Sequence, residues 1–263
     1  MKINEYYDDS ANISLNGSIA ALVPAVIIVF GNLSFYKNQE MMLLTIPFLI
    51  YSFICFHFYL FRMKQSILIA RNMVHTRNKS GNDSLFAARH LLLCSLNTHS
   101  PSLQFYFTNG ELAGRIKRYR RKGLSRIRPS KMYALYNPQD EAIGFFEVKG
   151  KSNIKIGAFD QERRYLGCFE KRKLTWRKNK KQLLDAAGKS IGVVEGSSVF
   201  MDERVIHSRN QPVLRLRRGW MPVEWSTYFP EPNTPVLSFL GTLSDKEKLL
   251  RMSFLINEYF IER

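Results

Sequence analysis

The chain has 263 residues, a formal net charge of +17 and a hydrophobic content of 45%. Its three cysteines, Cys55, Cys94 and Cys168, are scattered and form no CxxC pair, so the sequence indicates neither a disulfide framework nor a zinc ribbon. Free thiols agree with a reducing cytoplasm.

Two stretches near the N-terminus, residues 10–36 and 41–61, carry no charge. Each supplies about twenty apolar-dominated residues, roughly the length of a helix that crosses a bilayer. Core helices of soluble proteins normally carry a polar stripe, and IAALVPAVIIVF (residues 19–30) has none. A secretory signal peptide is an alternative for the first stretch, but the preceding residues are acidic and no cleavage pattern follows. We therefore predict a transmembrane helical hairpin over residues 1–64.

The distribution of basic residues predicts the orientation of this hairpin. Only residues 36–40 separate the two stretches, and they contain Lys37 as their one basic residue. Five basic residues follow the second stretch: Arg62, Lys64, Arg71, Arg77 and Lys79. Because basic residues are enriched on the cytoplasmic side, we expect a cell-membrane protein with two spans and both termini in the cytoplasm. His57 is expected to reach the membrane interface, although an intramembrane functional role is the alternative.

Residues 65–101 are expected to form a basic connecting region, in which residues 85–96 could be a short helix or a strand. His90 and Cys94 have the spacing of metal ligands on a helix. Because the chain has no second pair of this kind, packing is the favoured role for both.

The positive charge is concentrated between residues 62 and 131, where the sequence has fifteen Lys and Arg residues and two acidic residues. The candidate lipid-binding or anion-binding residues of its densest block are Arg115, Lys117, Arg118, Arg120, Arg121, Lys122, Arg126 and Arg128. Each basic side chain near an anionic leaflet gains about 1 kcal/mol. The alternatives are a solvated loop and, since Tyr119 and Tyr133 are interleaved, a nucleic-acid surface. A membrane tether favours the lipid, so nucleic acid is an unlikely partner.

A second candidate anion-binding group comprises Arg215, Arg217 and Trp220. The two arginines alternate and therefore point to one face of a strand. Trp220 could insert at an interface while the arginines contact phosphate. An equally favoured interpretation is that Trp220 and Trp225 are packed and the arginines are solvated.

From residue 102 onward, a short apolar or aromatic run, a polar turn and a small-apolar pair recur. The pairs lie 22 to 25 residues apart: Ile143-Gly144, Leu166-Gly167, Ile191-Gly192, Val213-Leu214 and Val236-Leu237. This spacing is the length of one β-hairpin per repeat. Residues 102–263 are therefore predicted to be mainly β, with about twelve antiparallel strands that require closure or two stacked sheets.

The last segment has the pattern of a helix. Ser244 and Glu247 form a capping box, and apolar residues occupy every face from residue 249 to residue 261. A helix that is apolar all round is buried or in lipid, and the uncharged stretch 252–257 is too short to span a bilayer. We therefore predict an antiparallel hairpin-repeat barrel around a C-terminal helix, preceded by the two-helix transmembrane hairpin.

Successive hairpins that close on an apolar C-terminal helix resemble the tubby C-terminal superfamily, which includes LURP-one-related and phospholipid scramblase-like domains. The matching stretches are residues 136–144, 159–167 and 185–192, and the resemblance covers about residues 102–263. It implies a twelve-stranded barrel threaded by the final helix, association with phosphoinositide or phospholipid surfaces, and no metabolic enzyme activity. The chain departs from scramblases in its N-terminal membrane segments and in lacking a clear calcium-binding segment.

The sequence contains no HExxH, GxSxG or dinucleotide-binding motif, and an acid–base pair could form only through the fold. Residues 187–190 (AGKS) mimic the end of a phosphate-binding loop, but the glycine required five positions before Gly188 is Leu183. We expect a non-enzymatic scaffold, sensor or accessory factor without metal or cofactor, which binds anionic phospholipid or a protein partner. The alternatives are scramblase-like lipid transport and membrane-tethered nucleic-acid binding.

Overall fold

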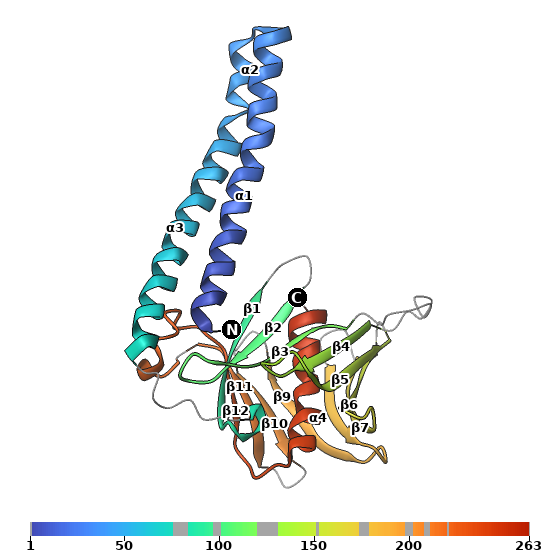
Figure 1. Cartoon of the computed structure of the whole chain (residues 1–263). Helices are drawn as coiled ribbons and strands as arrows, with labels where there is room; N and C mark the ends of the chain where they lie inside the picture. The colour runs from blue at the N-terminus through green and yellow to red at the C-terminus, as the bar shows by residue number, and fades with distance from the viewer. Residues whose placement is uncertain are drawn as a thin grey trace. The chain divides into compact units, whose positions relative to one another are not determined.

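The computed structural model describes residues 2–75, 84–96, 101–119, 131–150, 153–173, 179–197, 202–207, 211–219 and 221–262. The chain divides into two compact units, Met1–Arg77 and Asn78–Arg263. The first unit is a helical hairpin and the second is a β-barrel with a C-terminal helix (Figure 1).

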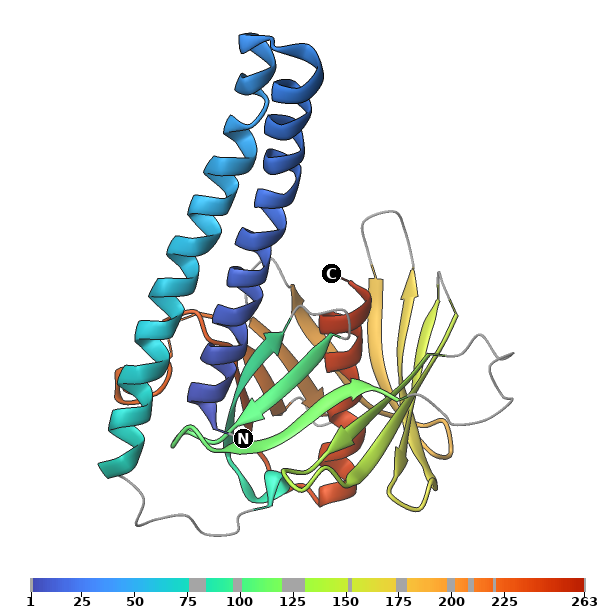
Figure 2. The ribbon, with the colours of Figure 1, turned by 45° about the horizontal axis from the view of Figure 1, so that its top comes forward.

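The hairpin consists of two long helices that lie side by side (Figure 2). Its elements are α1 (Ile3–Gly31), a π-helical turn (Asn32–Tyr36), α2 (Gln39–Leu43) and α3 (Ile46–His75). Lys37 adopts a left-handed conformation with φ of 48°, and the side chain of Asn38 accepts a hydrogen bond from the first turn of α2. The chain therefore reverses at the predicted position.

Small residues bring α1 and α3 together. Ser18 Oγ and Ser52 Oγ form a hydrogen bond of 2.9 Å inside the hairpin, and Ser66 Oγ donates to the carbonyl oxygen of Asn4 at 3.0 Å. These contacts set one antiparallel register along the two helices. Short side chains at such positions allow close helix packing where no hydrophobic driving force operates.

The outward faces of both helices are apolar. Phe30 is 70% exposed and Phe53 is 71% exposed, whereas a core helix of a soluble protein would bury such side chains. With 29 and 30 residues, α1 and α3 are long and apolar enough to cross a membrane. His57 is exposed on α3, one helical turn before the uncharged stretch ends.

The described residues of the second unit form a closed barrel of twelve antiparallel strands, in agreement with the prediction. The strands are β1 (His90–Leu96), β2 (Ser102–Tyr106), β3 (Leu112–Arg118), β4 (Lys131–Tyr136), β5 (Ala142–Lys149), β6 (Ile154–Asp160), β7 (Tyr165–Lys173), β8 (Asn179–Asp185), β9 (Ser190–Ser197), β10 (Asp202–His207), β11 (Pro212–Arg217) and β12 (Val236–Phe239). Each strand pairs with its neighbours in sequence, and β12 pairs with β1. This pairing leaves the sheet without an open edge.

The barrel begins before residue 102, because β1 lies within the predicted connecting region 65–101. The sequence of β1, HLLLCSL, lacks the alternation of a half-buried strand. Leu91 and Leu93 belong to the barrel core, while Leu92 and Cys94 are buried as well. His90 and Cys94 therefore lie on a strand, and His90 Nδ1 is 2.9 Å from Ser238 Oγ.

The connection between β11 and β12 covers the outer side of the first strands. The ring of Trp225 lies 5.7 Å from that of His90, and Phe229 lies 6.2 Å from Tyr106 between ring centres. Phe229 is fully buried. Burial and the charge of Glu231 raise the pKa of the Cys94 thiol, which therefore stays protonated. Trp225 itself is half-buried.

Four hairpin turns share one geometry. The turns that start at Phe107, Asn137, Asp160 and Asp185 each place a left-handed residue three positions later: Gly110, Asp140, Arg163 and Gly188. In the last three turns, a side-chain oxygen of the first residue also accepts the backbone N–H four positions on. This is a three-residue hairpin loop with a bulge, and it explains the recurring polar turns of the sequence.

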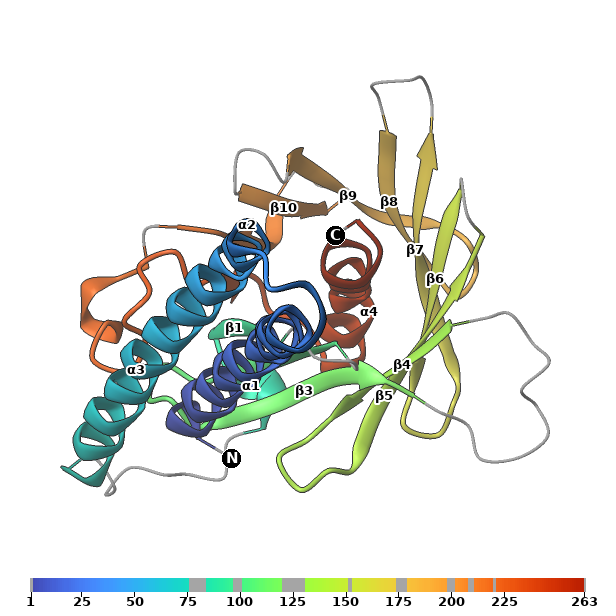
Figure 3. The same ribbon diagram turned by 90° about the horizontal axis from the view of Figure 1, so that it is seen from above.

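The helix α4 (Asp245–Ile256) lies inside the barrel and continues as a π-helical segment, Asn257–Ile261 (Figure 3). The predicted capping box is present, because Ser244 and Glu247 exchange hydrogen bonds. All residues from Leu249 to Ile256 are buried. The helix runs close to β5, β6 and β7, where Gly144 leaves room for it.

Candidate functional site

The basic block begins on β3, where its first two side chains form ion pairs. Arg115 Nη2 lies 3.0 Å from Asp140 Oδ2, and Lys117 Nζ lies 3.1 Å from Asp140 Oδ1. The β4–β5 turn places Asp140 beside β3 in its left-handed position. The hydrogen bond from Lys117, with the charge of Arg115, holds the pKa of Asp140 below its usual range. Asp140 therefore acts as a fixed counter-ion to both predicted site residues.

Next to this ion pair lies an aromatic and cationic group outside the barrel. Tyr119 and Phe145 meet edge to face, with ring centres 5.4 Å apart. The guanidinium carbon of Arg163 lies 4.9 Å from the centre of the Phe145 ring, and its Nη2 donates to Tyr119 Oη at 3.1 Å. Arg118 is exposed as well, but it lies opposite the core residue Tyr133 in the β3–β4 register and so points to the other face of β3 from Arg115 and Lys117. Such stacking leaves a guanidinium able to contact an anion from its outer edge.

We call these side chains together the β3–β6 surface: Arg115, Lys117, Tyr119, Phe145 and Arg163. Arg163 and Phe145 were not predicted as members, because Arg163 lies in a turn 45 positions after Arg118 and Phe145 lies within an apolar strand. Its turn lacks the glycine found at positions 110 and 188, but so does the turn at Asp140, so the sequence does not single out Arg163.

Six predicted site residues lie outside the described residues. They are Arg120, Arg121, Lys122, Arg126, Arg128 and Trp220. The first five follow Tyr119 directly in the connection between β3 and β4.

The second predicted group is divided by the structure. Arg215 forms a two-pronged ion pair with Asp202, with Nε 2.8 Å from Oδ1 and Nη2 2.8 Å from Oδ2. This hydrogen bonding lowers the pKa of Asp202 to about 2. Arg217 is exposed and has no ion pair among the described residues. The charge of Arg215 is therefore balanced by Asp202, whereas Arg217 faces solvent.

A buried ionic cluster at the C-terminal end of α4 was not predicted. It brings together Lys171, Lys181, Glu203, Arg218, Glu258 and Glu262 from three strands, the residue after β11 and the final segment. The carboxylates of Glu203 and Glu258 are almost completely buried. Sequence spacing gives no indication of this cluster, because its members meet only after the barrel closes.

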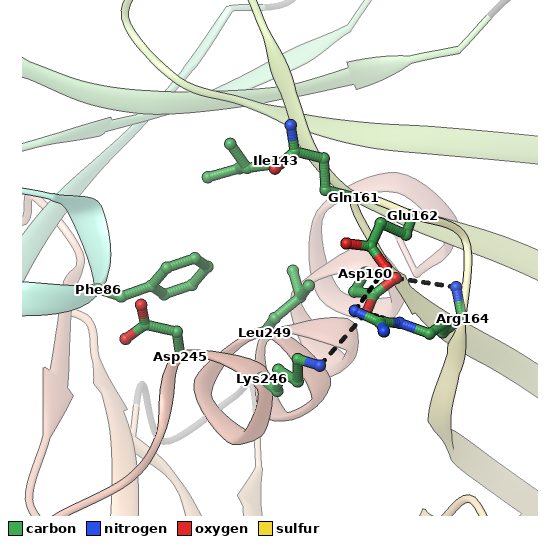
Figure 4. A pocket seen from close by; sticks show the side chains of 9 residues that line it. All are labelled: Phe86, Ile143, Asp160, Gln161, Glu162, Arg164, Asp245, Lys246 and Leu249. Carbon is green, nitrogen blue, oxygen red and sulfur yellow. Dashed lines mark hydrogen bonds and ion pairs between the residues drawn. The ribbon is translucent and has the colours of Figure 1, made fainter.

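A pocket of about 230 Å³ lies at the other end of α4 (Figure 4). Phe86, Ile143 and Leu249 contribute apolar side chains to it, and the charged residues Asp160, Glu162, Arg164, Asp245 and Lys246 line the rest. Asp160 pairs with Arg164 at 2.9 Å and with Lys246 at 3.5 Å. The charged groups are thus largely satisfied by one another, and Asp160 also closes the β6–β7 turn.

Within the described residues, no group of three or more His, Cys, Asp or Glu side chains could hold a metal ion. Cys55, Cys94 and Cys168 are free, and the latter two are buried. The arrangement best suited to contact a ligand is the β3–β6 surface, where the exposed guanidinium of Arg163 is held on two aromatic rings beside Arg115 and Lys117.

No protein-family model matches the chain, and no curated protein matches it. Among solved structures, the chain is similar to an Arabidopsis thaliana protein determined by X-ray crystallography. The two are 12% identical, the match covers 66% of this chain and 91% of that one, and the TM-score is 0.42.

Proposed function

We propose that the chain is a membrane-anchored, non-enzymatic protein of the tubby-like type, whose barrel unit faces the cytoplasm. The outward apolar faces of α1 and α3 support a transmembrane hairpin. The basic residues that follow the second apolar stretch support cytoplasmic termini. The closed barrel with its internal helix supports the tubby-like assignment.

The ligand that fits the β3–β6 surface best is anionic phospholipid. The observation that carries this proposal is Arg163, whose exposed guanidinium stacks on the rings of Tyr119 and Phe145. Tyr119 is followed directly in sequence by the basic run that begins at Arg120. Arginine and aromatic side chains suit the boundary between phosphate groups and apolar lipid. A membrane anchor keeps that ligand close, and each added cation gains about 1 kcal/mol near an anionic leaflet.

Liposome flotation of the barrel unit, residues 78–263, tests this proposal. We expect the unit to float with vesicles of phosphatidylcholine and phosphatidylserine and to stay in solution with phosphatidylcholine alone. Neutralisation to glutamine of Arg118, Arg120, Arg121 and Lys122 should abolish flotation. Binding should also weaken as salt is added, since the contact is electrostatic.

A matched variant controls for the loss of charge as such. It neutralises Lys173, Lys180, Lys189 and Arg204, which are exposed on other strands and turns, and it should float like the parent. Equal flotation of the two variants would contradict a specific surface. If the parent does not float with anionic vesicles, the lipid proposal is wrong and a protein partner becomes the leading alternative. An oligonucleotide of similar charge is the competitor that would reveal nucleic-acid binding.

A further inference from the structure

The ionic cluster at the C-terminal end of α4 contains two buried carboxylates that share one lysine. Lys181 Nζ lies 2.7 Å from Glu258 Oε1 and 3.3 Å from Glu203 Oε1. Glu203 belongs to β10 and Lys181 to β8, whereas Glu258 belongs to the final segment Asn257–Ile261. The cluster therefore connects the wall of the barrel to the end of the chain.

Other charged groups surround this trio. Glu262 lies 3.7 Å from Lys181 and pairs with Lys171 of β7. Arg218 lies 3.9 Å from Glu258 Oε2 and places its guanidinium over the ring of Tyr259. The cluster thus contains three basic side chains and three carboxylates. The basic residues are Lys171, Lys181 and Arg218, and the acids are Glu203, Glu258 and Glu262. Asn257 Nδ2 also donates a hydrogen bond to Glu258 Oε1 at 2.9 Å. Glu258 therefore has more hydrogen-bond and ion-pair partners than Glu203.

Glu203 is the less well satisfied of the two buried acids. Its Oε2 has no hydrogen-bond partner, although only 3% of the residue is exposed. A buried charge without enough partners is costly, and protonation is the usual way to avoid that cost. Burial, followed by the charge of Glu258, raises the pKa of Glu203 to about 7 despite the opposing effect of Lys181.

We propose that Glu203 and Glu258 form a proton-binding site that controls how tightly the segment Asn257–Ile261 is held at the end of the barrel. With a proton on Glu203, the two carboxyl groups no longer repel each other, and Lys181 pairs with Glu258. Without it, Glu203 and Glu258 are both charged and buried, Lys181 is the partner that they share, and Oε2 of Glu203 stays without a hydrogen bond. Local opening of the segment then relieves their repulsion. This inference does not depend on lipid binding.

The direction of the pH effect follows from linkage. A carboxyl group whose pKa is raised in the closed state stabilises that state at low pH. The stabilisation is lost as the pH rises from the normal glutamate pKa of about 4.3 to the closed-state value. The equilibrium constant for opening of the segment should increase by up to about tenfold per pH unit between about pH 5 and pH 7. Above about pH 7 it should stay constant.

Hydrogen–deuterium exchange of the full chain in detergent micelles measures this opening. Protection factors of residues 257–262, corrected for the intrinsic exchange rate, should fall between pH 5 and pH 7 and then stay constant. In Glu203→Gln, which mimics the protonated state, protection at pH 8 should match the wild type at pH 5. Glu195→Gln, on the neighbouring strand at an exposed position, should leave the wild-type profile unchanged.

A flat wild-type profile, or a Glu203→Gln profile equal to that of the wild type, would overturn the proposal. Should Glu203→Gln not fold, a titration of the glutamate side-chain carboxyl carbons by NMR in the wild type decides instead. One of these carbons must then titrate between about two and three pH units above the others, near pH 7. Normal titration of every glutamate would also overturn the proposal.

Discussion

Leu249 of α4 occupies the space in which a side chain at Gly144 of β5 would lie. A Cβ atom at Gly144 would come within 2.6 Å of Leu249 Cδ1, closer than any ordinary contact. The glycine thereby allows the central helix to pack directly on the backbone of the barrel wall. The repeated small-apolar pair of the sequence has a defined structural purpose at this position.

Gly144→Ala should therefore destabilise the barrel, because the added methyl group must displace Leu249. We expect a loss of about 1 to 3 kcal/mol in the free energy of unfolding, measured by chemical denaturation of the barrel unit. The control is Gly241→Ala, where the nearest side-chain atom would lie at an ordinary 3.5 Å. In combination with Leu249→Ala, the Gly144→Ala change should cost less than it does alone, and strict additivity would contradict the contact.

The barrel could be predicted because most strands alternate apolar and polar residues or end in polar turns of the same kind. β1 could not be classified from sequence, because its inner face meets the core and its outer face is covered by the β11–β12 connection. Its partner β12 is also distant in sequence, with His90 opposite Ser238. Local patterns contain no information on such closing pairs.

The candidate site was predicted in part. The run from Arg115 onward drew attention to β3 through charge density alone, but the counter-ion Asp140 comes from the next hairpin turn. Arg163 reaches the same surface from a third hairpin. Contacts across strands depend on register, and register is set only when the sheet forms.

The contact between Gly17 and Cys55 provides a test of the helical hairpin. A Cβ atom at Gly17 would lie 3.6 Å from Cys55 Sγ, which is close enough for a disulfide after a small adjustment. Gly17→Cys should therefore form an intramolecular disulfide with Cys55 when the full chain in micelles is mildly oxidised. Mass spectrometry of the digested protein detects it. Gly31→Cys, which has no atom of another residue nearby, should not cross-link to Cys55, and a cross-link there would contradict the register.

The pair of Asp202 and Arg215 predicts a pH dependence of stability. Because hydrogen bonds from Arg215 lower the pKa of Asp202 to about 2, the pair stabilises the fold above about pH 4. That contribution is lost as the pH falls toward 2. Asp202→Asn should cost about 1 kcal/mol at pH 7, a value reduced for solvent screening of the partly exposed pair. The difference from wild type should shrink between pH 4 and pH 2 in urea unfolding, and a constant difference would contradict this account.

Removal of Asp140 should strengthen the proposed lipid contact. Asp140 neutralises Arg115 and Lys117, so Asp140→Asn would release both cations while asparagine tolerates the left-handed turn position. We expect binding to anionic vesicles to tighten about fivefold, which corresponds to about 1 kcal/mol for one charge near the surface. Glu141→Gln removes the same charge at the adjacent exposed position. If the two variants bind equally, the effect is one of net charge and the surface is not specific.

Arg163→Gly separates the stability of the barrel from its proposed function. Arg163 holds a left-handed conformation with φ of 63°, which costs a non-glycine residue about 1 to 2 kcal/mol, while Gly110 and Gly188 occupy the equivalent positions of two other turns. Glycine removes this strain but also the contact with Phe145, so the free energy of unfolding should stay within about 1 kcal/mol of the wild type. Binding to anionic vesicles should nevertheless weaken about fivefold, because one cation is lost from the surface. Arg163→Lys keeps the charge without the planar stacking. Its affinity for anionic vesicles should lie between that of the wild type and that of Arg163→Gly. Unchanged vesicle binding by Arg163→Gly would show that the strained arginine has no part in lipid recognition.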